Sequence, residues 1–321
     1  MDTALAPWAS QSLVARFQRL GLFFQVAVAA VSGGLLWPDH PWLAGVVGFS
    51  VLLLPLPVLG LEFLLLRRVG RADPVPLPGW PVLVGAWVTE SAHYLRVFCW
   101  QQPFRWRAIP DRLQGEGIRG RRGVVLVHGF CCNRGFWNDW MQRLARENRA
   151  FVAVNLEPVF SSIDGYVPIL DHALSRVEAA TGLPPLLVCH SMGGLVARAW
   201  LAKHRAGGAY RHDPVFRVVT IGSPHHGTWL ARFSHTANGR QMRKGSDWME
   251  GLQASWAEGR AGLPPHRFTC WYSNADNIVM PPSSGTLRGA DNRLVQGAGH
   301  VALAQWPEVI EGTLAYLDEG T

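Results

Sequence analysis

The chain has 321 residues, of which 48% are hydrophobic and 17% are charged. It is therefore too apolar for a disordered protein and too long for a short peptide module, and its length suits a catalytic domain with an appendage. The formal net charge is +7, and lysine occurs only at Lys203 and Lys244, so the charge is carried by arginine. This arginine excess suits phosphate or lipid headgroups, or it is a bias of composition.

The five cysteines include no CxxC pair and no Cys/His spacing of a zinc site. A disulfide framework is not expected, and reduced thiols favour the cytoplasmic side of a membrane.

Two long apolar segments lie near the start of the chain. Residues 20–38 and 40–61 contain no Asp, Glu, Lys or Arg, and Trp37 and Trp42 flank the short break between them. Each segment is long enough to cross about 30 Å of hydrocarbon as a helix. Residues 1–70 are therefore predicted to form a membrane anchor with two transmembrane helices.

Basic residues flank this pair of segments at both outer ends: Arg16, Arg19, Arg67, Arg68 and Arg71. The positive-inside rule then places both ends in the cytoplasm. We expect a multi-pass protein of the inner (cytoplasmic) membrane with a cytoplasmic catalytic domain. A cleaved signal peptide over the first segment is the rival interpretation. Pro55 and Pro57 favour a kink in the second span, or a re-entrant segment.

Residues 71–122 are predicted to be a linker and a basic juxtamembrane segment. The first part contains four prolines that cannot continue a helix, at Pro74, Pro76, Pro78 and Pro81. Seven arginines lie between Arg96 and Arg122, against two acidic residues. Residues 80–94 are expected to lie against lipid headgroups or to pack on the main domain.

From residue 123 to 321 short apolar strands alternate with helices. We predict strands at 124–127, 151–154, 186–189, 215–221, 267–272 and 293–295, and helices at 137–147, 166–180, 193–204 and 301–317. This alternation predicts an α/β fold with a mostly parallel sheet that is buried on both faces.

The strongest local motif runs from Leu186 to Gly194, where a buried strand enters a tight turn and then a helix. It has the pattern of a nucleophile elbow, G-x-S-x-G, with Ser191 at the apex and Cys189 at the first small-residue position. The turn places Ser191 at a helix N-terminus, where free N–H groups favour developing negative charge. The larger Cys189 weakens the match to the motif.

With this elbow the sequence resembles the α/β-hydrolase family, and more narrowly the bacterial triacylglycerol lipases and their intracellular esterase relatives. The resemblance covers about residues 123–317. It also rests on Val127-His128-Gly129-Phe130, on the segment from Thr220 to Thr228, and on the chain order of Asp276 and His300. It implies the α/β-hydrolase fold and acyl-transfer chemistry.

A serine nucleophile needs a base, and histidine has the pKa for that task. Among the 12 histidines, His300 follows the last predicted strand, where this fold places its catalytic imidazole. Asp276 is the best candidate to orient it. Asp291 is the competitor but lies in a turn, and Asp247 resembles a helix N-cap.

The other histidines near the motifs are not expected to act as the base. His190 is expected to point away from Ser191, and His128 lies in the loop after the first strand. His225 and His226 are expected to order the loop from Ser223 to Thr228.

The resemblance alone assigns the oxyanion hole to the backbone N–H groups of Phe130 and Met192. No cofactor is predicted. Secreted lipases of this kind often hold calcium, but the sequence offers no convincing ligand set, so no metal is predicted.

Residues 228–265 interrupt the alternation of strands. Apolar side chains recur there at helical spacing, at Met242, Trp248, Met249, Leu252 and Trp256. The segment is a candidate cap over an acyl pocket, or a helix packed on the core, and both interpretations stay open. Phosphate-binding loops and nucleic-acid-binding motifs are absent from the sequence.

These features predict a membrane-anchored serine hydrolase that cleaves carboxylic ester bonds of lipid-like substrates through an acyl-enzyme. The expected partners are a lipid or other ester substrate and the membrane, with no nucleic acid. An acyltransferase or thioesterase with the same triad is one alternative. A membrane-tethered scaffold without catalysis is the other.

Overall fold

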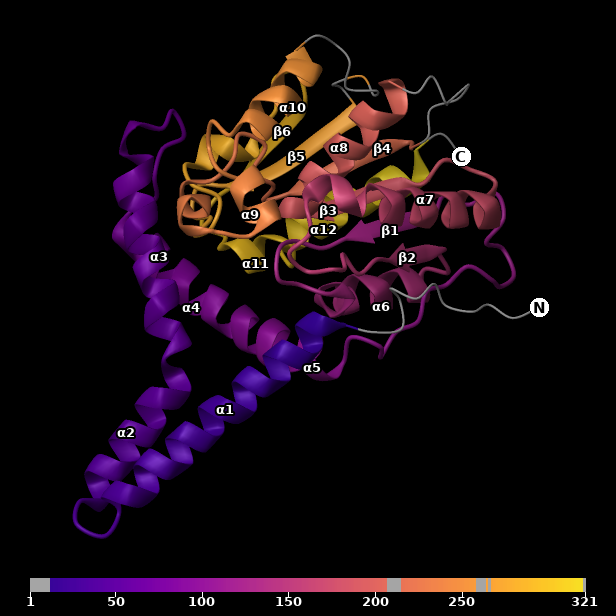
Figure 1. Cartoon of the computed structure of the whole chain (residues 1–321). Coiled ribbons are helices and arrows are strands. Elements are labelled where there is room, and N and C mark those ends of the chain that lie inside the picture. The colour runs from indigo at the N-terminus through magenta and orange to yellow at the C-terminus, as the bar shows by residue number, and fades with distance from the viewer. Residues whose placement is uncertain (1–11, 207–214, 258–263, 265–266, 320–321) are drawn as a thin grey trace.

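The computed structural model describes residues 12–206, 215–257, 264 and 267–319. Its centre is a six-stranded parallel sheet with the order β2-β1-β3-β4-β5-β6 (Figure 1). The strands are β1 (Val124–Val127), β2 (Phe151–Ala153), β3 (Leu186–His190), β4 (Arg217–Ile221), β5 (Phe268–Ser273) and β6 (Asp291–Val295). The predicted α/β fold with a parallel sheet is confirmed.

Helices cover both faces of this sheet, which is why its central strands are continuous apolar runs. They are α6 (Asn138–Arg146), α7 (Val167–Thr181), α8 (Met192–Ala206), α10 (Asp247–Ala257), α11 (His300–Leu303) and α12 (Pro307–Leu314). Alternate residues of β1 and β3 pack into two clusters. Val125 and Leu187 join a cluster with side chains of α7, α8 and α10, whereas Val124 and Leu186 join one with α6 and α12.

The prediction of one continuous closing helix over residues 301–317 is wrong. The chain forms α11, breaks, and then forms α12 and a 3₁₀ turn over Ala315–Asp318. Pro307 is the first residue of α12. Since proline has no N–H and crowds the preceding turn, it starts a helix but cannot lie inside one.

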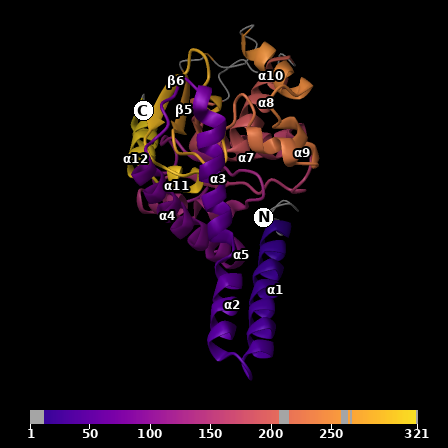
Figure 2. The ribbon, with the colours of Figure 1, turned by 90° about the vertical axis from the view of Figure 1, so that its left-hand side faces the viewer.

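The N-terminal part consists of α1 (Leu13–Leu36), α2 (Pro41–Leu53), α3 (Pro55–Val69) and α4 (Trp80–Arg96), followed by a π-helical turn (Val97–Gln101) and the short α5 (Gln102–Phe104). Helices α1 and α2 lie side by side and project away from the sheet, as Figures 1 and 2 show from two directions. Helix α3 then runs back along the α/β body. Helix α4 runs from beside α3 toward α5, below the α/β body in the view of Figure 1.

Helix α1 is long and apolar enough to cross a membrane, and almost all of its surface is exposed. The second apolar segment is not one straight helix: α2 and the segment Pro55–Ala72 meet at a bend of 53°. The break lies at Pro55, in agreement with the expected kink. By length and composition the described residues thus hold one spanning helix, or two if the bent pair counts as one span.

Helices α3 and α4 pack on the α/β body. Phe63 and Leu66 of α3 and Leu83 and Ala86 of α4 form a third apolar cluster with Ala275 and Met280, which follow β5. The other face of α4 exposes apolar side chains such as Val84 and Val88. Helix α4 therefore packs on the main domain on one side, which is one of the two expected arrangements.

The proline-containing segment between α3 and α4 is also attached to the body. The Asp73 carboxylate accepts hydrogen bonds from the backbone N–H and the hydroxyl of Ser283, and Asn274 donates to the carbonyl of Pro76 at 3.2 Å. The predicted boundaries at 70 and 122 remain predictions, but α3 and α4 contact the α/β body rather than lying apart from it.

The described residues of the candidate cap use their apolar stripe to pack on the core. Met249, Leu252 and Trp256 of α10 are buried in the cluster that includes α7 and α8. Residues 258–263 and 265 lie outside the described part of the chain.

Candidate active site

Ser191 lies between the last residue of β3 and the first residue of α8, at the C-terminal edge of the sheet. Its φ is +54°, a left-handed conformation that non-glycine residues adopt only rarely. A Cβ atom on Gly193 would lie 2.7 Å from the carbonyl oxygen of Val127 and 2.9 Å from that of His128. Only glycine fits there, so the close crossing expected of a nucleophile elbow is present.

The loop after β1 lies against this elbow. A Cβ atom on Gly129 would lie 2.7 Å from Cβ of Ser191. The loop is held by the buried His128, whose Nε2 accepts a hydrogen bond from the backbone N–H of Leu156 at 3.1 Å. The proton of the neutral ring therefore lies on Nδ1, which is 2.9 Å from the carbonyl of Gly129. Burial lowers the pKa of His128 to about 4, against the effect of the Gly129 hydrogen bond, and keeps the ring neutral.

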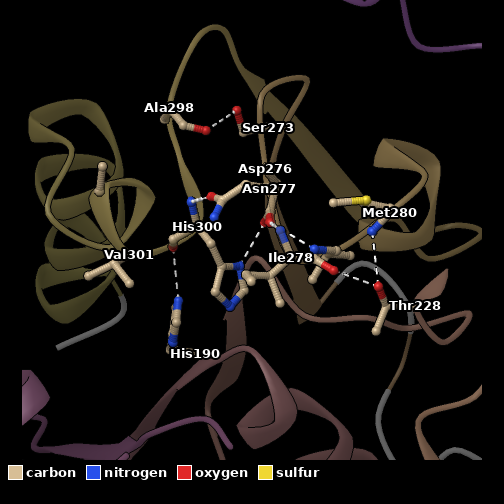
Figure 3. A network of polar contacts seen from close by, with 12 residues as sticks. His190, Thr228, Ser273, Asp276, Asn277, Ile278, Met280, Ala298, His300 and Val301 are labelled. Carbon is tan, nitrogen blue, oxygen red and sulfur yellow. Dashed lines mark hydrogen bonds and ion pairs between the residues drawn. The ribbon is translucent and has the colours of Figure 1, made fainter. Parts of the chain in front are cut away.

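Asp276 follows β5, and His300 is the first residue of α11 after β6. Oδ2 of Asp276 lies 2.9 Å from Nδ1 of His300 (Figure 3). Oδ1 of Asp276 accepts hydrogen bonds from the backbone N–H groups of Ile278 and Val279, at 2.9 and 2.8 Å. The carboxylate is thus fixed on both oxygens, and the structure brings the predicted acid and base together.

Both members of this pair are buried, with exposed fractions of 2% for Asp276 and 6% for His300. Burial opposes the charged imidazolium, but the charge and hydrogen bond of Asp276, with the charges of Glu90 and Glu62, outweigh burial and raise the pKa of His300. A Cβ atom on Gly222 would lie 3.0 Å from Oδ2 of Asp276 and 3.2 Å from Nδ1 of His300. The glycine after β4 therefore leaves room for the pair.

Ser191 and His300 line the same cavity, which has a volume of about 250 Å³. No hydrogen bond between the Ser191 hydroxyl and His300 occurs among the described residues. Such contacts are often long without substrate and tighten in the Michaelis complex. The arrangement places all three predicted triad residues at one edge of the sheet, with the serine and the imidazole facing one space.

Of the predicted oxyanion residues, Phe130 lies in the loop after β1 and Met192 directly follows Ser191. Phe130 lines the cavity, and Met192 begins α8 with its side chain buried. Within the described part of the chain, no acceptor is found for the backbone N–H of either residue. Met192 is not among the residues that line the cavity, and the assignment of both N–H groups to an oxyanion hole remains a prediction.

The two competing carboxylates lie in other places. Asp291 begins β6 and its Oδ2 accepts a hydrogen bond from Nε of Arg293 at 2.8 Å. Asp247 is the first residue of α10 and is not its N-cap as expected, because the hydroxyl of Ser246 accepts the hydrogen bond from the backbone N–H of Met249 at 3.2 Å. Neither is among the residues that line the cavity.

His190 packs its ring against Phe136 and against His300, with ring centroids 4.4 and 4.6 Å apart. Its Nε2 lies 3.1 Å from the carbonyl oxygen of His300, so it donates there and does not serve as the base for Ser191 (Figure 3). The ring nevertheless lines the cavity, so its expected direction away from the site is only partly right. His225 is buried beneath the site, with Nε2 2.9 Å from Oγ1 of Thr220.

The cavity also contains residues that sequence analysis did not connect with the site. Leu59 and Glu62 come from α3, Glu90 and Tyr94 from α4, and Asn277 follows Asp276. A signal was present, because Glu62 is the only charged residue between 40 and 66 and Glu90 the only one between 80 and 95. A lone carboxylate in an apolar helix needs a partner when it is buried.

None of the described residues of the candidate cap, 228–265, lines this cavity. The outer side of the cavity is formed by α3, α4 and the turn after α4. Nor do the described residues contain a group of three or more His, Cys, Asp or Glu side chains that could hold a metal ion.

A parallel sheet with an elbow after β3, a carboxylate after β5 and a histidine after β6 defines the α/β-hydrolase fold. Residues 124–314 match the alpha/beta hydrolase family, which is more than half of the chain. The chain therefore belongs to the alpha/beta hydrolase family, as its sequence motifs indicate. The search of curated proteins gave no significant match.

Among solved structures the chain is similar to the mature form of a lipase from Bacillus licheniformis, with a TM-score of 0.51 and 18% identity over 63% of this chain and 92% of that chain. It is also similar to lipase B from Aspergillus fumigatus, with a TM-score of 0.49 and 19% identity over 61% and 53%. A monoacylglycerol lipase from Paleococcus ferrophilus has a TM-score of 0.45 and 16% identity over 63% and 95%. At 18% identity the likeness to the Bacillus licheniformis lipase concerns the fold alone.

Proposed function

We propose that the protein is a membrane-anchored serine hydrolase that cleaves carboxylic ester bonds of lipid-like substrates through an acyl-enzyme. The observation that carries the proposal is the buried Asp276–His300 pair, whose imidazole faces the same cavity as the strained Ser191. A scaffold without catalysis has no need for a buried aspartate and histidine beside a serine in a rare backbone conformation.

The proposed mechanism follows from the hydrogen bond between Asp276 and His300. Because Nδ1 of His300 is bound to the carboxylate, Nε2 is the atom that takes the Ser191 proton. Ser191 Oγ then bonds to the ester carbonyl carbon, and the N–H groups of Phe130 and Met192 stabilise the oxyanion. His300 returns the proton to the leaving alcohol, and it next removes a proton from the water that cleaves the acyl-enzyme.

The membrane part of the proposal is supported by the surface of the N-terminal helices. Nearly all large exposed apolar side chains of the described residues lie between Leu13 and Phe104. Helix α1 is 24 residues long, enough to cross the hydrocarbon core. Trp37 and Trp42 are exposed at the turn between α1 and α2, as expected at an interface with water.

The lipid part of the proposal is supported by the cavity. Leu59 of α3 and Tyr94 of α4 line it together with Phe98 and Ile278. Helix α3, which forms part of its outer side, directly follows the exposed apolar helix α2 in the chain. An acyl chain held in the bilayer would meet apolar side chains along this route.

Labelling with a fluorophosphonate probe tests the nucleophile. The wild-type protein in detergent is expected to be labelled, and Ser191→Ala is expected to lose labelling and most turnover while it stays folded. Ser255→Ala is the matched control, because Ser255 is a half-buried serine on α10 that does not line the cavity. Equal labelling of wild type and Ser191→Ala would reject the nucleophile, and no labelling of the wild type would favour the scaffold.

Hydrolysis of p-nitrophenyl esters of increasing acyl length tests the substrate class. We expect kcat/KM to rise with acyl length and with presentation in mixed micelles. A preference for acetate esters in either form contradicts the lipid assignment. Product analysis with an added alcohol or thiol separates hydrolysis from acyl transfer, which uses the same acyl-enzyme.

Protease accessibility tests the orientation. The proposed cytoplasmic domain should be digested in inverted inner-membrane vesicles and protected in right-side-out spheroplasts. Digestion in spheroplasts contradicts the orientation, and recovery of the intact chain in the soluble fraction contradicts the anchor.

A further inference from the structure

The backbone of the segment that begins with His300 is held by side chains from two other parts of the chain. The backbone N–H of His300 donates to Oδ1 of Asn277 at 3.0 Å (Figure 3). The N–H groups of Val301 and Ala302 donate to the two carboxylate oxygens of Glu90, at 2.8 and 2.9 Å. The first N–H groups of a helix have no partner within it, so these contacts fix the position of α11 and with it the His300 backbone.

Glu90 belongs to α4, 210 residues before His300, and only 1% of it is exposed. A Cβ atom on Gly299 would lie 2.5 Å from Oε2 of Glu90. Glycine at this position therefore lets the carboxylate approach the backbone beside His300. A buried carboxylate is costly unless it is bound by hydrogen-bond donors, and here both donors adjoin the predicted base.

A second carboxylate, that of Glu62, supports the His300 backbone indirectly, through Asn277. Oε2 of Glu62, on α3, accepts a hydrogen bond from Nδ2 of Asn277 at 2.6 Å. This bond orients the Asn277 amide so that Oδ1 faces the His300 N–H. Helices α3 and α4 therefore each supply one acidic side chain to the support of the same segment.

We propose that Glu90 is a positioning residue for His300, so that the membrane-proximal helix α4 is an integral part of the active site. The proposal rests on the proposed function, in which His300 is the base. Glu90 holds the backbone on which the imidazole is mounted, and its negative charge stabilises the imidazolium that forms when Ser191 attacks.

The titratable groups that face His300 come from four parts of the chain. Asp276 follows β5, Glu90 lies on α4 and Glu62 on α3, and all three favour the protonated ring. His190, at the end of β3, packs against it as a neutral ring because burial, with the charge of His300, lowers its pKa well below 6.5. Burial raises the pKa of Glu90 itself to about 7, against the hydrogen bonds from Val301 and Ala302. Glu90 is therefore negative above this pH, where the enzyme is expected to work.

The test compares Glu90→Gln with Glu90→Asp in the full-length protein in detergent. The second-order rate of fluorophosphonate labelling and kcat/KM for a soluble ester are measured from pH 5 to 9. Glu308→Gln is the control, because Glu308 is an exposed carboxylate in the first turn of α12. Ser191→Ala reports separately on the proposed function.

For Glu90→Gln we expect kcat and the labelling rate to fall about 10- to 100-fold. KM should stay within about twofold, because glutamine keeps the size of this cavity-lining side chain while the imidazole is displaced. Loss of the negative charge lowers the pKa of His300, so the acidic limb of both pH profiles should move to lower pH by about one unit. Glu90→Asp keeps the charge and should show less than half of this displacement. Glu308→Gln should match the wild type.

The proposal is overturned if Glu90→Gln keeps the wild-type rate and pH profile while Ser191→Ala is inactive. It is also overturned if the rate falls but the acidic limb does not move, since a purely structural role predicts that result. If Glu90→Gln does not fold, Glu62→Gln is used instead, because it keeps the shape of the side chain that orients Asn277. It should move the acidic limb in the same direction by a smaller amount, and a wild-type profile would overturn the proposal.

Discussion

Nδ1 of His300 and Oδ2 of Asp276 are 2.9 Å apart, and both side chains are buried. Since an ionised carboxylate only accepts hydrogen bonds, the proton of the neutral imidazole must lie on Nδ1. Nε2 is left with its lone pair toward the cavity. This relationship sets the tautomer on which the proposed chemistry depends, and it leads to the first prediction.

Asp276→Asn is expected to lower kcat by about 10⁴-fold, the loss typical of a triad whose histidine is held in the wrong tautomer. The amide keeps the shape of the carboxylate, but its NH₂ group donates where an acceptor is needed. Steady-state hydrolysis of a soluble ester measures the effect.

Asp291→Asn is the control for this prediction, because Asp291 binds Arg293 and does not line the cavity. It should keep kcat within about threefold of the wild type. A severe loss for Asp291→Asn with little effect of Asp276→Asn would exchange the roles of the two residues.

The pH dependence of kcat/KM is the second prediction. The base must be neutral, and the pKa of His300 is raised above its ordinary value of 6.5, since the charges of Asp276, Glu90 and Glu62 outweigh burial. The imidazole therefore stays protonated to a higher pH than a free histidine does. We expect the acidic limb to have its midpoint above pH 6.5, with activity rising toward higher pH. A midpoint at or below pH 6 in a profile of the wild-type enzyme contradicts this electrostatic account.

The third prediction concerns the elbow. Gly193→Ala would place a Cβ atom 2.7 Å from the carbonyl oxygen of Val127, a contact that backbone movement must relieve. We expect a loss of about 1 to 3 kcal/mol in the free energy of unfolding and a lower melting temperature in detergent.

Gly251→Ala is the matched control, because Gly251 is exposed in the middle of α10 and no atom lies within 4 Å of its added Cβ. There alanine should stabilise the helix by about 0.5 to 1 kcal/mol. Equal melting temperatures for the two variants would show that the elbow has more room than its geometry indicates.

Much of the catalytic body could be predicted because its signals are local. The apolar runs of β1 and β3 identify buried strands, and the turn at Ser191 needs small residues at fixed positions. The order of Ser191, Asp276 and His300 along the chain then follows from the fold. These inferences need no knowledge of which distant elements touch.

The docking of α3 and α4 could not be predicted in the same way. Their apolar residues serve two different contacts, with the core through Phe63 and Leu83 and with the exterior through Leu61 and Val84. Composition alone does not separate these faces. The lone acids Glu62 and Glu90 were the available signal, but their partners lie more than 200 residues away. The break before Pro307, by contrast, was readable from the proline itself.

The fourth prediction tests whether α3 forms part of the substrate site. Leu59 lines the cavity, whereas Leu61, two residues later on the same helix, is 55% exposed. Leu59→Trp fills part of a cavity of about 250 Å³. We expect kcat/KM for long-chain esters to fall by about 10-fold or more, because a hydrophobic pocket discriminates by roughly 1 to 3 kcal/mol for each methylene. Hydrolysis of an acetate ester should change by less than about threefold, since its acyl group needs little of the cavity.

Leu61→Trp has the same substitution on the exposed face of α3 and should leave the dependence on acyl length unchanged. If Leu59→Trp lowers the hydrolysis of short and long esters equally, then the substitution disturbs the catalytic residues and not an acyl site. If neither variant changes the dependence, the acyl chain lies elsewhere, and the contribution of α3 is limited to the hydrogen bond between Glu62 and Asn277. Only a selective loss with Leu59→Trp supports an acyl site formed by a helix that follows the exposed apolar helix α2.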